Sequence, residues 1–389
     1  MSLRVLYVIN GLGTGGAERS LAELLPGIVD AGVEPSVAFL YRRSEGVEGD
    51  VERLGVPLRH VAAARLTSRV AALRRFVAEQ RPHLVHATLF EAGLVARFAS
   101  SRRVRLLESL VNTTYDPVRR GDPAVRPMKL SAIRHVDAWT ARRYVTHFHA
   151  ITPTVKRHAV ATLGVRPDHV TVIERGRDPS RLGAPSVERR RRARVTLGLG
   201  AGDEVVVSVG RQEFQKGHRF LLEAVATLVP DRPRLVVLVA GRSGAATVEL
   251  GQQARGPRLE GRIRFLGHRD DLPEVLAAGD LFAFPSLYEG LGGSVLEAMA
   301  LGVPVVASDL PALRDVLDAG HDAVLVPPGQ PGPLAMAMAE LLDDPIRARR
   351  LGERARQSFL DRFTSSRSTE RMLDLYDRLV PNGRQVVVR

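Results

Sequence analysis

Short apolar segments alternate along the chain with longer segments in which apolar residues recur at a helical period. The short segments are bounded by turn residues and have the length of buried strands, about four to eight residues. Their alternation with helical segments predicts repeated βα units and mostly parallel sheets. The predicted strands are residues 4–9, 36–41, 84–86, 105–109, 147–151 and 170–173 in the first half, and 205–209, 235–240, 263–265, 281–284, 303–307 and 323–326 in the second.

The segment between the two predicted sheets, residues 177–204, has no strand pattern and is rich in glycine, proline and charge. A chain of 389 residues also exceeds what one hydrophobic core usually serves. We therefore predict two Rossmann-like domains, residues 1–180 and 181–365, which face a central cleft that binds ligands at the carboxyl ends of the strands. Residues 366–389 are predicted to form a C-terminal helix that packs back on the first domain. The arginine run at 189–192 is interpreted as a solvated linker helix, with a nucleic-acid contact as the less favoured alternative.

The net charge of +13 indicates an anionic partner such as a phosphorylated substrate or a membrane surface. Nearly all of it comes from arginine, which a bias in coding composition would also produce, and lysine occurs only at 129, 156 and 216. No cysteine is present, so thiolate chemistry and disulfides are excluded. The apolar segments are too short to span a bilayer, and the N-terminus has the pattern of a strand rather than a signal peptide. These features predict a cytoplasmic protein.

The first predicted strand leads into glycines at 11, 13 and 16, which satisfy the G-x-G-x-x-G pattern of dinucleotide-binding folds. NAD is disfavoured because Arg42 and Arg43, rather than an acid, follow the second strand. An NADP-dependent oxidoreductase and a purely structural glycine turn both stay open on this evidence.

In the second half, VGRQEFQKG at 209–217 places Arg211 and Lys216 just after a predicted strand. A guanidinium and an ammonium together suit a diphosphate, which needs several charge-assisted contacts. The alternative is a basic turn on the surface with no role in binding.

Residues 287–300, LYEGLGGSVLEAMA, place glutamates at 289 and 297 on either side of a glycine turn at the start of a helical pattern. The amides of residues 292–294 would lie at a helix N-terminus, where phosphate binds favourably. Carboxylates at these positions suit the hydroxyls of a sugar or ribose. A capping box formed by Ser294 and Glu297 explains the same spacing, and Asp309 in the next loop is interpreted as a helix cap.

Three motifs together resemble the retaining glycosyltransferases of family 4, which have the two-domain GT-B fold. The segment at 285–309 is similar to their E-x7-E region, 209–217 to their G-R…K-G loop, and INGLGTGGAE at 9–18 to their N-terminal glycine turn. The likeness extends to HDAVLVPPGQP at 321–331 and the closing helical segment.

The resemblance implies a nucleotide-sugar donor, a hydroxyl-bearing acceptor and no required metal or other cofactor. It assigns the first domain to the acceptor and the second to the donor. Arg211 and Lys216 would hold the donor diphosphate, Glu289 the transferred sugar and Glu297 the nucleotide ribose, with Arg211, Lys216 and Glu289 as the catalytic set. The remaining implied donor contacts are Gly15, Gly16, Gly290, Leu291, Gly292, Gly293 and Ser294.

The sequence departs from the family pattern on the acceptor side. Asn112 stands where many members have a histidine beside the sugar, and residues 175–178 read RGRD where N-G-V-D is usual. Glu18, His86 and Asn112 are the acceptor contacts that we consider, with a structural role as the alternative for His86. A non-catalytic sugar-nucleotide binding protein is the alternative function.

Residues 65–81 combine a helical period with arginines on one face and apolar residues on the other. Such a helix could lie on an anionic membrane at its inner face or pack as an ordinary surface helix on a sheet.

Overall fold

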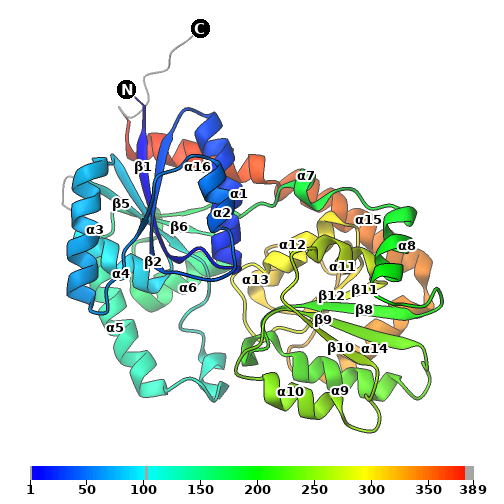
Figure 1. Cartoon of the computed structure of the whole chain (residues 1–389). Helices are drawn as coiled ribbons and strands as arrows, with labels where there is room; N and C mark the ends of the chain where they lie inside the picture. The colour runs from blue at the N-terminus through cyan, green and yellow to red at the C-terminus, as the bar shows by residue number, and fades with distance from the viewer. Residues whose placement is uncertain (1, 101–103, 382–389) are drawn as a thin grey trace. The chain divides into compact units, whose positions relative to one another are not determined.

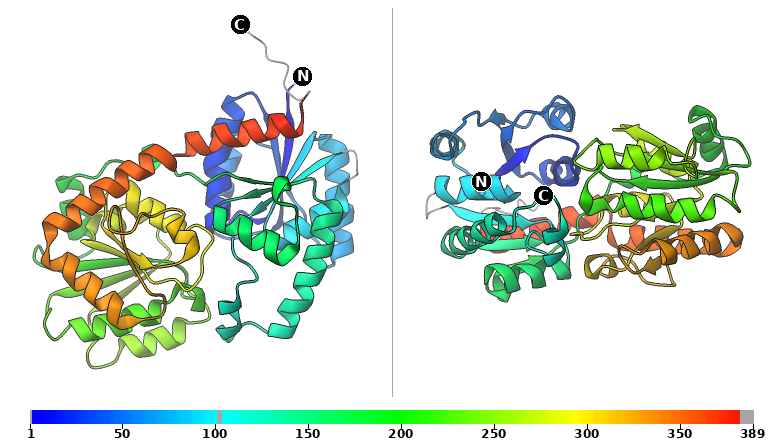
Figure 2. Two further views of the ribbon diagram at one scale, coloured as in Figure 1. Left: turned by 180° about the vertical axis from the view of Figure 1, so that it is seen from behind. Right: turned by 90° about the horizontal axis from the view of Figure 1, so that it is seen from below.

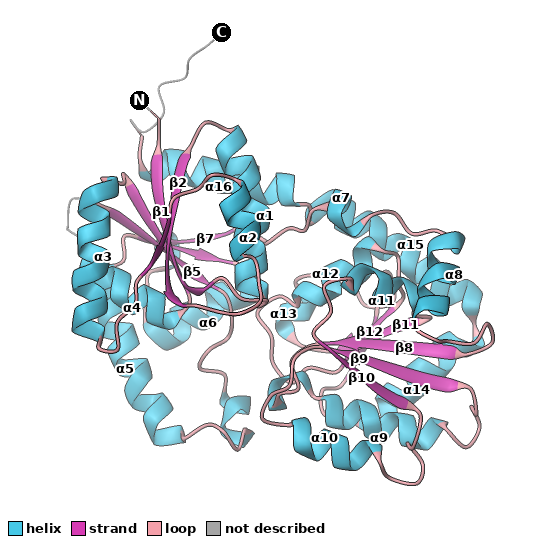
Figure 3. Cartoon of the chain, viewed as in Figure 1, coloured by secondary structure: helices cyan, strands magenta, loops and turns pink. Residues whose placement is uncertain are grey.

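Two separate parallel sheets organise the chain in the computed structural model, which describes residues 2–100 and 104–381 (Figure 1). The first unit contains the described residues up to Tyr115, Pro127–Arg177 and those from Thr364 onward. The second unit contains Asp116–Arg126 and Asp178–Phe363. Each unit is an α/β structure with helices on the faces of its own sheet (Figure 3).

The first sheet has seven parallel strands in the order β3-β2-β1-β4-β5-β6-β7, a doubly wound arrangement. Its strands are β1 (Arg4–Gly11), β2 (Glu34–Tyr41), β3 (Leu58–His60), β4 (Leu84–Thr88), β5 (Arg105–Leu110), β6 (His147–Ala150) and β7 (Val170–Val172). The α-helices of this unit are α1 (Gly16–Asp30), α2 (Glu48–Arg53), α3 (Leu66–Gln80), α4 (Phe90–Ala99), α5 (Pro127–Tyr144), α6 (Pro153–Leu163) and α16 (Ser365–Leu379).

The second sheet has six parallel strands in the order β10-β9-β8-β11-β12-β13. Its strands are β8 (Glu204–Val209), β9 (Leu235–Ala240), β10 (Ile263–Gly267), β11 (Leu281–Phe284), β12 (Val305–Ser308) and β13 (Val324–Val326). Its α-helices are α7 (Pro179–Leu182), α8 (Val187–Thr196), α9 (His218–Leu228), α10 (Thr247–Ala254), α11 (Leu272–Ala278), α12 (Gly293–Ala300), α13 (Pro311–Arg314), α14 (Pro331–Asp343) and α15 (Pro345–Arg362).

All twelve strands expected from the sequence are present, with bounds within two residues of the predicted ones. The sequence missed β3, an edge strand whose three residues Leu-Arg-His pair with β2. An edge strand is buried on fewer sides than a central one, so β3 lacks the continuous apolar run by which the other strands are recognised.

The C-terminal helix α16 belongs to the first unit, where it packs against α1 (Figure 2). Met372, Leu375 and Tyr376 lie on one face of the helix at i, i+3 and i+4 and are buried in the same core as the β1 side chains. The predicted boundary between residues 180 and 181 falls within α7, and residues 382–389 lie outside the described residues.

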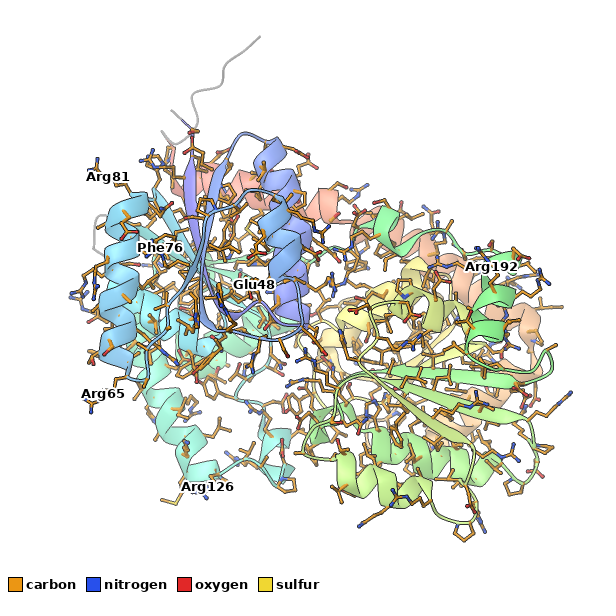
Figure 4. All side chains as sticks on the ribbon, viewed as in Figure 1. Glu48, Arg65, Phe76, Arg81, Arg126 and Arg192 are labelled. Atoms are coloured by element: carbon orange, nitrogen blue, oxygen red, sulfur yellow. The ribbon has the colours of Figure 1, made fainter. Side chains whose placement is uncertain are left out.

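The arginine run lies on a helix as predicted, but it is solvated only in part, because Arg191 and Arg192 are exposed and Arg189 is buried. Arg189 and Arg194 are buried in the second unit, where Arg189 pairs with Glu274 at 2.8 Å and Arg194 with Asp280 at 2.6 Å. Arg192, by contrast, is exposed on the outer face of α8 (Figure 4). Arg189 and Arg190 of the run, together with Arg194, therefore attach α8 to α11 and to the start of β11.

A buried ion network joins three elements of the first unit. Arg97 on α4 donates to both carboxylate oxygens of Glu108 on β5, at 2.9 and 2.6 Å, and to Asp137 on α5 at 2.7 Å. Thr140 also accepts from Arg97, at 2.6 Å, and the Tyr115 hydroxyl donates to Asp137 at the same distance. Such a network holds its elements together only while every charge is paired.

Candidate active site

The loops after β8 and β11 meet in the second unit. The amide of Leu287 donates to the Gln215 carbonyl at 2.8 Å, and the Gln215 side chain donates to the Tyr288 carbonyl at 2.9 Å. Gly217 has φ +61°, and a Cβ at this position would lie 2.1 Å from the Pro285 carbonyl oxygen. Glycine is therefore required for this close approach, and it brings the two predicted donor loops together.

Lys216 and Glu289 form an ion pair between these two loops. Lys216 Nζ lies 2.5 Å from Glu289 Oε1, and the two side chains are 19% and 7% exposed. The Lys216 stem passes over Gly210, where a Cβ would meet its carbons at 2.9 Å. The ammonium lies 4.9 Å from the centre of the Phe284 ring. An ammonium has three donors, so Lys216 can bind an anion while keeping its bond to Glu289.

The glycine turn between the two glutamates opens directly into α12. Gly292 is the N-cap residue, with φ +84°, and a Cβ there would crowd Val295, Leu313 and Phe284 at 3.1 to 3.2 Å. Because Gly293 and Ser294 lie in the first turn of the helix, their amides have no intrahelical acceptor and suit an anion.

The capping-box interpretation is not supported by this geometry. Ser294 lies inside the helix rather than at its N-cap, and its hydroxyl donates to the Val209 carbonyl at 3.3 Å. Glu297 lies one turn further along α12 and is half-buried. Asp309 is likewise not a cap but pairs with Arg314 at 2.5 Å, which holds the pKa of its carboxyl below the usual value.

The other predicted donor contacts lie on the same two loops. Arg211 is exposed, and its side chain has no ion-pair or hydrogen-bond partner within the described residues. Gly290 and Leu291 are buried between Glu289 and the helix. The second unit therefore collects a free guanidinium, a paired ammonium, first-turn amides and two carboxylates.

Tyr288 and Arg119 lie near this site and were not among the residues predicted for it. Residues 116–126 belong to the second unit although the chain on both sides of them belongs to the first. The Arg119 guanidinium lies 5.8 Å from the centre of the Tyr288 ring, and burial raises the pKa of the Tyr288 hydroxyl. A segment that crosses from one unit to the other has no signature in the sequence, so this contact could not be predicted.

The first-unit glycine turn is ordered around Glu18 and Arg43. Gly15 and Gly16 are exposed at the start of α1, and a Cβ at Gly15 would lie 2.3 Å from a carboxylate oxygen of Glu18. Arg43 packs over Gly13, where a Cβ would lie 3.2 Å from its Cγ. Glycine at positions 13 and 15 thus permits the close approach of the Arg43 and Glu18 side chains.

His86 is buried within a continuous hydrogen-bond network. Its Nδ1 lies 2.7 Å from the Tyr376 hydroxyl and its Nε2 lies 2.7 Å from Ser109 Oγ. Ser109 continues to His149 at 2.8 Å, and Tyr376 continues to Tyr7 at 2.9 Å. Both ring nitrogens are paired inside the protein, which supports the structural alternative for His86, and the acceptor contact stays a prediction.

We predict that these histidines make the first unit sensitive to acid. Burial lowers the pKa of His149 to about 3 and the pKa of His86 well below 6.5. Below pH 6.5 the unfolded chain binds protons that the folded chain does not. The free energy of unfolding therefore decreases as the pH is lowered. The slope is at most about 1.4 kcal/mol per pH unit for each histidine.

Urea unfolding between about pH 7 and pH 5 measures this slope. His149→Gln should reduce it, and an unchanged slope in that variant would rule out His149 as a contributor.

A cavity of about 40 Å³ adjoins this network and is lined by Ser20, Ser109, Arg175 and Ser368, among others. Burial, and secondarily Arg177, lowers the pKa of Arg175 to about 10. The unusual R-G-R-D sequence thus places an arginine beside hydroxyl groups in a space large enough for a few waters.

Asn112 lies on the loop after β5 and is half-buried. Its side-chain oxygen accepts from the amide of Thr113 at 2.8 Å. The side-chain nitrogen has no partner within the described residues, so this amide can donate to a hydroxyl. Within residues 2–100 and 104–381, no group of three or more His, Asp or Glu side chains is arranged to hold a metal ion.

Comparison with known proteins gives matches over both units. Residues 15–176 match the family described as glycosyl transferase 4-like domain, and residues 189–358 match the family described as glycosyl transferases group 1. The chain is 30% identical over 407 residues to the D-inositol 3-phosphate glycosyltransferase of Kineococcus radiotolerans, with 94% of this chain and 91% of that protein covered.

The corresponding protein of Corynebacterium kroppenstedtii is 33% identical over 228 residues, with 57% of this chain and 50% of that protein covered. The chain thus spans about half the length of this relative and of several like it. The crystal structure of Anabaena HepE in complex with UDP and glucose superimposes with a TM-score of 0.85 at 23% identity, covering 96% of this chain and 99% of that one. The two parallel-sheet units therefore have the GT-B fold.

Proposed function

We propose that this chain, which belongs to the glycosyltransferases, moves a sugar from a nucleoside diphosphate sugar to a hydroxyl group of an acceptor. The observation that carries the proposal is the convergence of Lys216, Arg211 and the first-turn amides of α12 on one edge of the second sheet. All of them are positive or hydrogen-bond donors, and they match a diphosphate. The Anabaena structure, which contains UDP and glucose, supports this class of donor.

In this proposal the bond between the anomeric carbon and the departing phosphate oxygen breaks in a transition state that resembles an oxocarbenium ion. Negative charge grows on the departing diphosphate, and stabilising that charge is the main catalytic task. Lys216 and Arg211 supply positive charge, and the amides of Gly293 and Ser294 supply dipoles that already point at the site. These groups perform that task without a metal ion.

We further propose that the anomeric configuration is retained. The acceptor oxygen attacks the same face from which the diphosphate leaves, and a departing phosphate oxygen takes the acceptor proton. Glu289 then contacts hydroxyls of the transferred sugar, and no separate catalytic base is needed. Glu18 and Asn112 are the first-unit side chains that we propose for the acceptor.

Glu297→Ala is expected to weaken nucleotide binding by at least about 10-fold, since a charge-assisted hydrogen bond to a ribose hydroxyl contributes about 1.5 to 3 kcal/mol. Calorimetric titration with the nucleoside diphosphate measures the change. Thermal unfolding of the free variant serves as the control. Intact binding with a lowered unfolding temperature would assign Glu297 to helix stability instead.

A panel of UDP, GDP and ADP sugars tests the function. The correct donor should raise the unfolding temperature, because a ligand that binds only the folded state stabilises it. Release of nucleoside diphosphate identifies a transferring enzyme, and proton NMR of the product reports the anomeric configuration. Binding without release or transfer would favour a non-catalytic sugar-nucleotide binding protein, and an inverted product would refute retention.

A further inference from the structure

Helix α3, the segment that the sequence suggested for membrane contact, buries most of its large apolar residues, with Leu66 at its start 43% exposed. Leu73, Phe76 and Val77 are buried in the core of the first unit. Figure 4 shows Arg65 and Arg81 at the two ends of the helix, directed away from the sheet, with Phe76 on the sheet side. The outer face of α3 is therefore charged but offers little apolar surface to a bilayer.

Helix α5 (Pro127–Tyr144) has the opposite arrangement, with large apolar side chains on its outer face. Met128 is 89% exposed, Val136 is 52% exposed and Trp139 is 57% exposed. They follow one another at i, i+8 and i+11, a spacing that places them along one side of a helix with exposed Ala132 between them. Exposed apolar residues that gather on one face usually mark an interaction site.

Cations flank this apolar stripe. Lys129, Arg142 and Arg143 are all exposed on α5. The helix contains one acidic residue, Asp137, which is buried and paired with Arg97 on the inner face. The outer face is thus apolar at its centre, positive at its sides and free of carboxylates, which complements an anionic bilayer surface.

The inner face of α5 fixes the helix to its unit, and Arg142 adds a bond to the Leu163 carbonyl at the end of α6 (3.4 Å). Asp137 and Thr140 are buried and bond Arg97 of α4, and Ala141 is fully buried. Trp139 makes an edge contact with the Tyr144 ring, with ring centres 6.3 Å apart, and more than half of its side chain is exposed. A rigid helix with an unoccupied outer face loses little conformational entropy when it docks.

We propose that the outer face of α5, defined by Met128, Lys129, Val136, Trp139, Arg142 and Arg143, docks the protein on anionic membranes. The helix lies in the plane of the interface, with Met128, Val136 and Trp139 among the headgroups and acyl boundary and the cations near lipid phosphates. Indole side chains favour this zone because their ring is amphipathic. Within the part of the chain that the structure describes, no helix is long and apolar enough to cross a bilayer.

Trp139 is the only tryptophan of the chain, so its fluorescence reports docking directly. The full-length protein is titrated at low salt, without donor, with vesicles of phosphatidylglycerol and phosphatidylcholine. We expect the emission to shift to shorter wavelength, the shift to require phosphatidylglycerol, and added salt to reverse it. No shift on phosphatidylglycerol vesicles at low salt overturns the proposal.

Two variants and a matched control locate the surface by vesicle cosedimentation. Removing the three cations of α5 with Lys129→Gln, Arg142→Gln and Arg143→Gln should reduce binding about 100-fold, since each contributes about 5-fold. Met128→Ser with Val136→Ser should reduce it about 10-fold or more. The control Arg65→Gln, Arg74→Gln and Arg75→Gln removes the same charge from α3 and should bind almost as the unaltered protein does.

Equal loss in the α3 control would overturn the assignment to α5. A second result would also overturn the proposal: the protein does not bind vesicles, but sedimentation detects a concentration-dependent dimer that the α5 substitutions abolish. The outer face of α5 would then bind a second copy of the chain. Circular dichroism of each variant excludes loss of the helix as the cause.

Discussion

Lys216→Ala is expected to lower kcat/KM for the donor by about 10-fold to 150-fold, the loss that follows from removing one charge-assisted contact of about 1.5 to 3 kcal/mol. Lys216 contributes an ammonium that is only partly exposed, so water does not fully screen its interaction with an anion. Because the charge on the diphosphate grows in the transition state, kcat should fall more than donor affinity. Steady-state kinetics with the donor found in the panel measures both.

The Lys216 variant also leaves the buried Glu289 carboxylate unpaired, so its stability must be followed by thermal unfolding. Lys216→Ala combined with Glu289→Gln removes that uncompensated charge and should recover stability without recovering kcat. Arg255→Ala, which removes an exposed charge from the same unit, should retain normal kinetics. Unchanged donor kinetics in Lys216→Ala would refute the diphosphate assignment.

Arg97→Ala is expected to destabilise the first unit by about 3 to 5 kcal/mol, the range measured when one partner of a buried ion pair is removed. The substitution leaves Glu108 and Asp137 as buried carboxylates without their cation. Burial already raises the pKa of Glu108, and the Arg97 charge opposes that shift. In Arg97→Ala, Glu108 should therefore take up a proton when the chain folds.

Urea unfolding followed by Trp139 fluorescence measures the effect, because Trp139 lies on α5 beside the network. Arg166→Ala breaks a fully exposed pair with Asp168 and provides the control, which should unfold as the unaltered protein does. A loss below about 1 kcal/mol in Arg97→Ala would show that the network contributes little to stability.

The strands could be predicted because a parallel sheet buries both faces of each strand and leaves a continuous apolar run in the sequence. The same topology explains the prediction of the site, since loops that follow neighbouring parallel strands meet at one edge. The Lys216 loop follows β8 and the Glu289 loop follows β11, and these strands are paired. The proximity of the two loops thus follows from the strand order alone.

The errors arose where long-range partners decide the role of a side chain. Arg189 was interpreted as a solvated charge because its partner Glu274 lies 85 residues away in sequence. The exposed apolar face of α5 was missed for the converse reason, because helical period alone does not tell which face is covered. For His86 the sequence left a structural role and an acceptor contact open, because its partner Tyr376 lies almost 300 residues later in the chain.

Hydrogen exchange measured by mass spectrometry, with and without the nucleoside diphosphate selected by the panel, tests the central claim most directly. The claim is that the loops of the second unit bind the donor diphosphate. The account predicts slower exchange in residues 210–217 and 287–297 of the second unit. Protection confined to residues 8–20 and 41–46 of the first unit, with none in the second-unit loops, would contradict it.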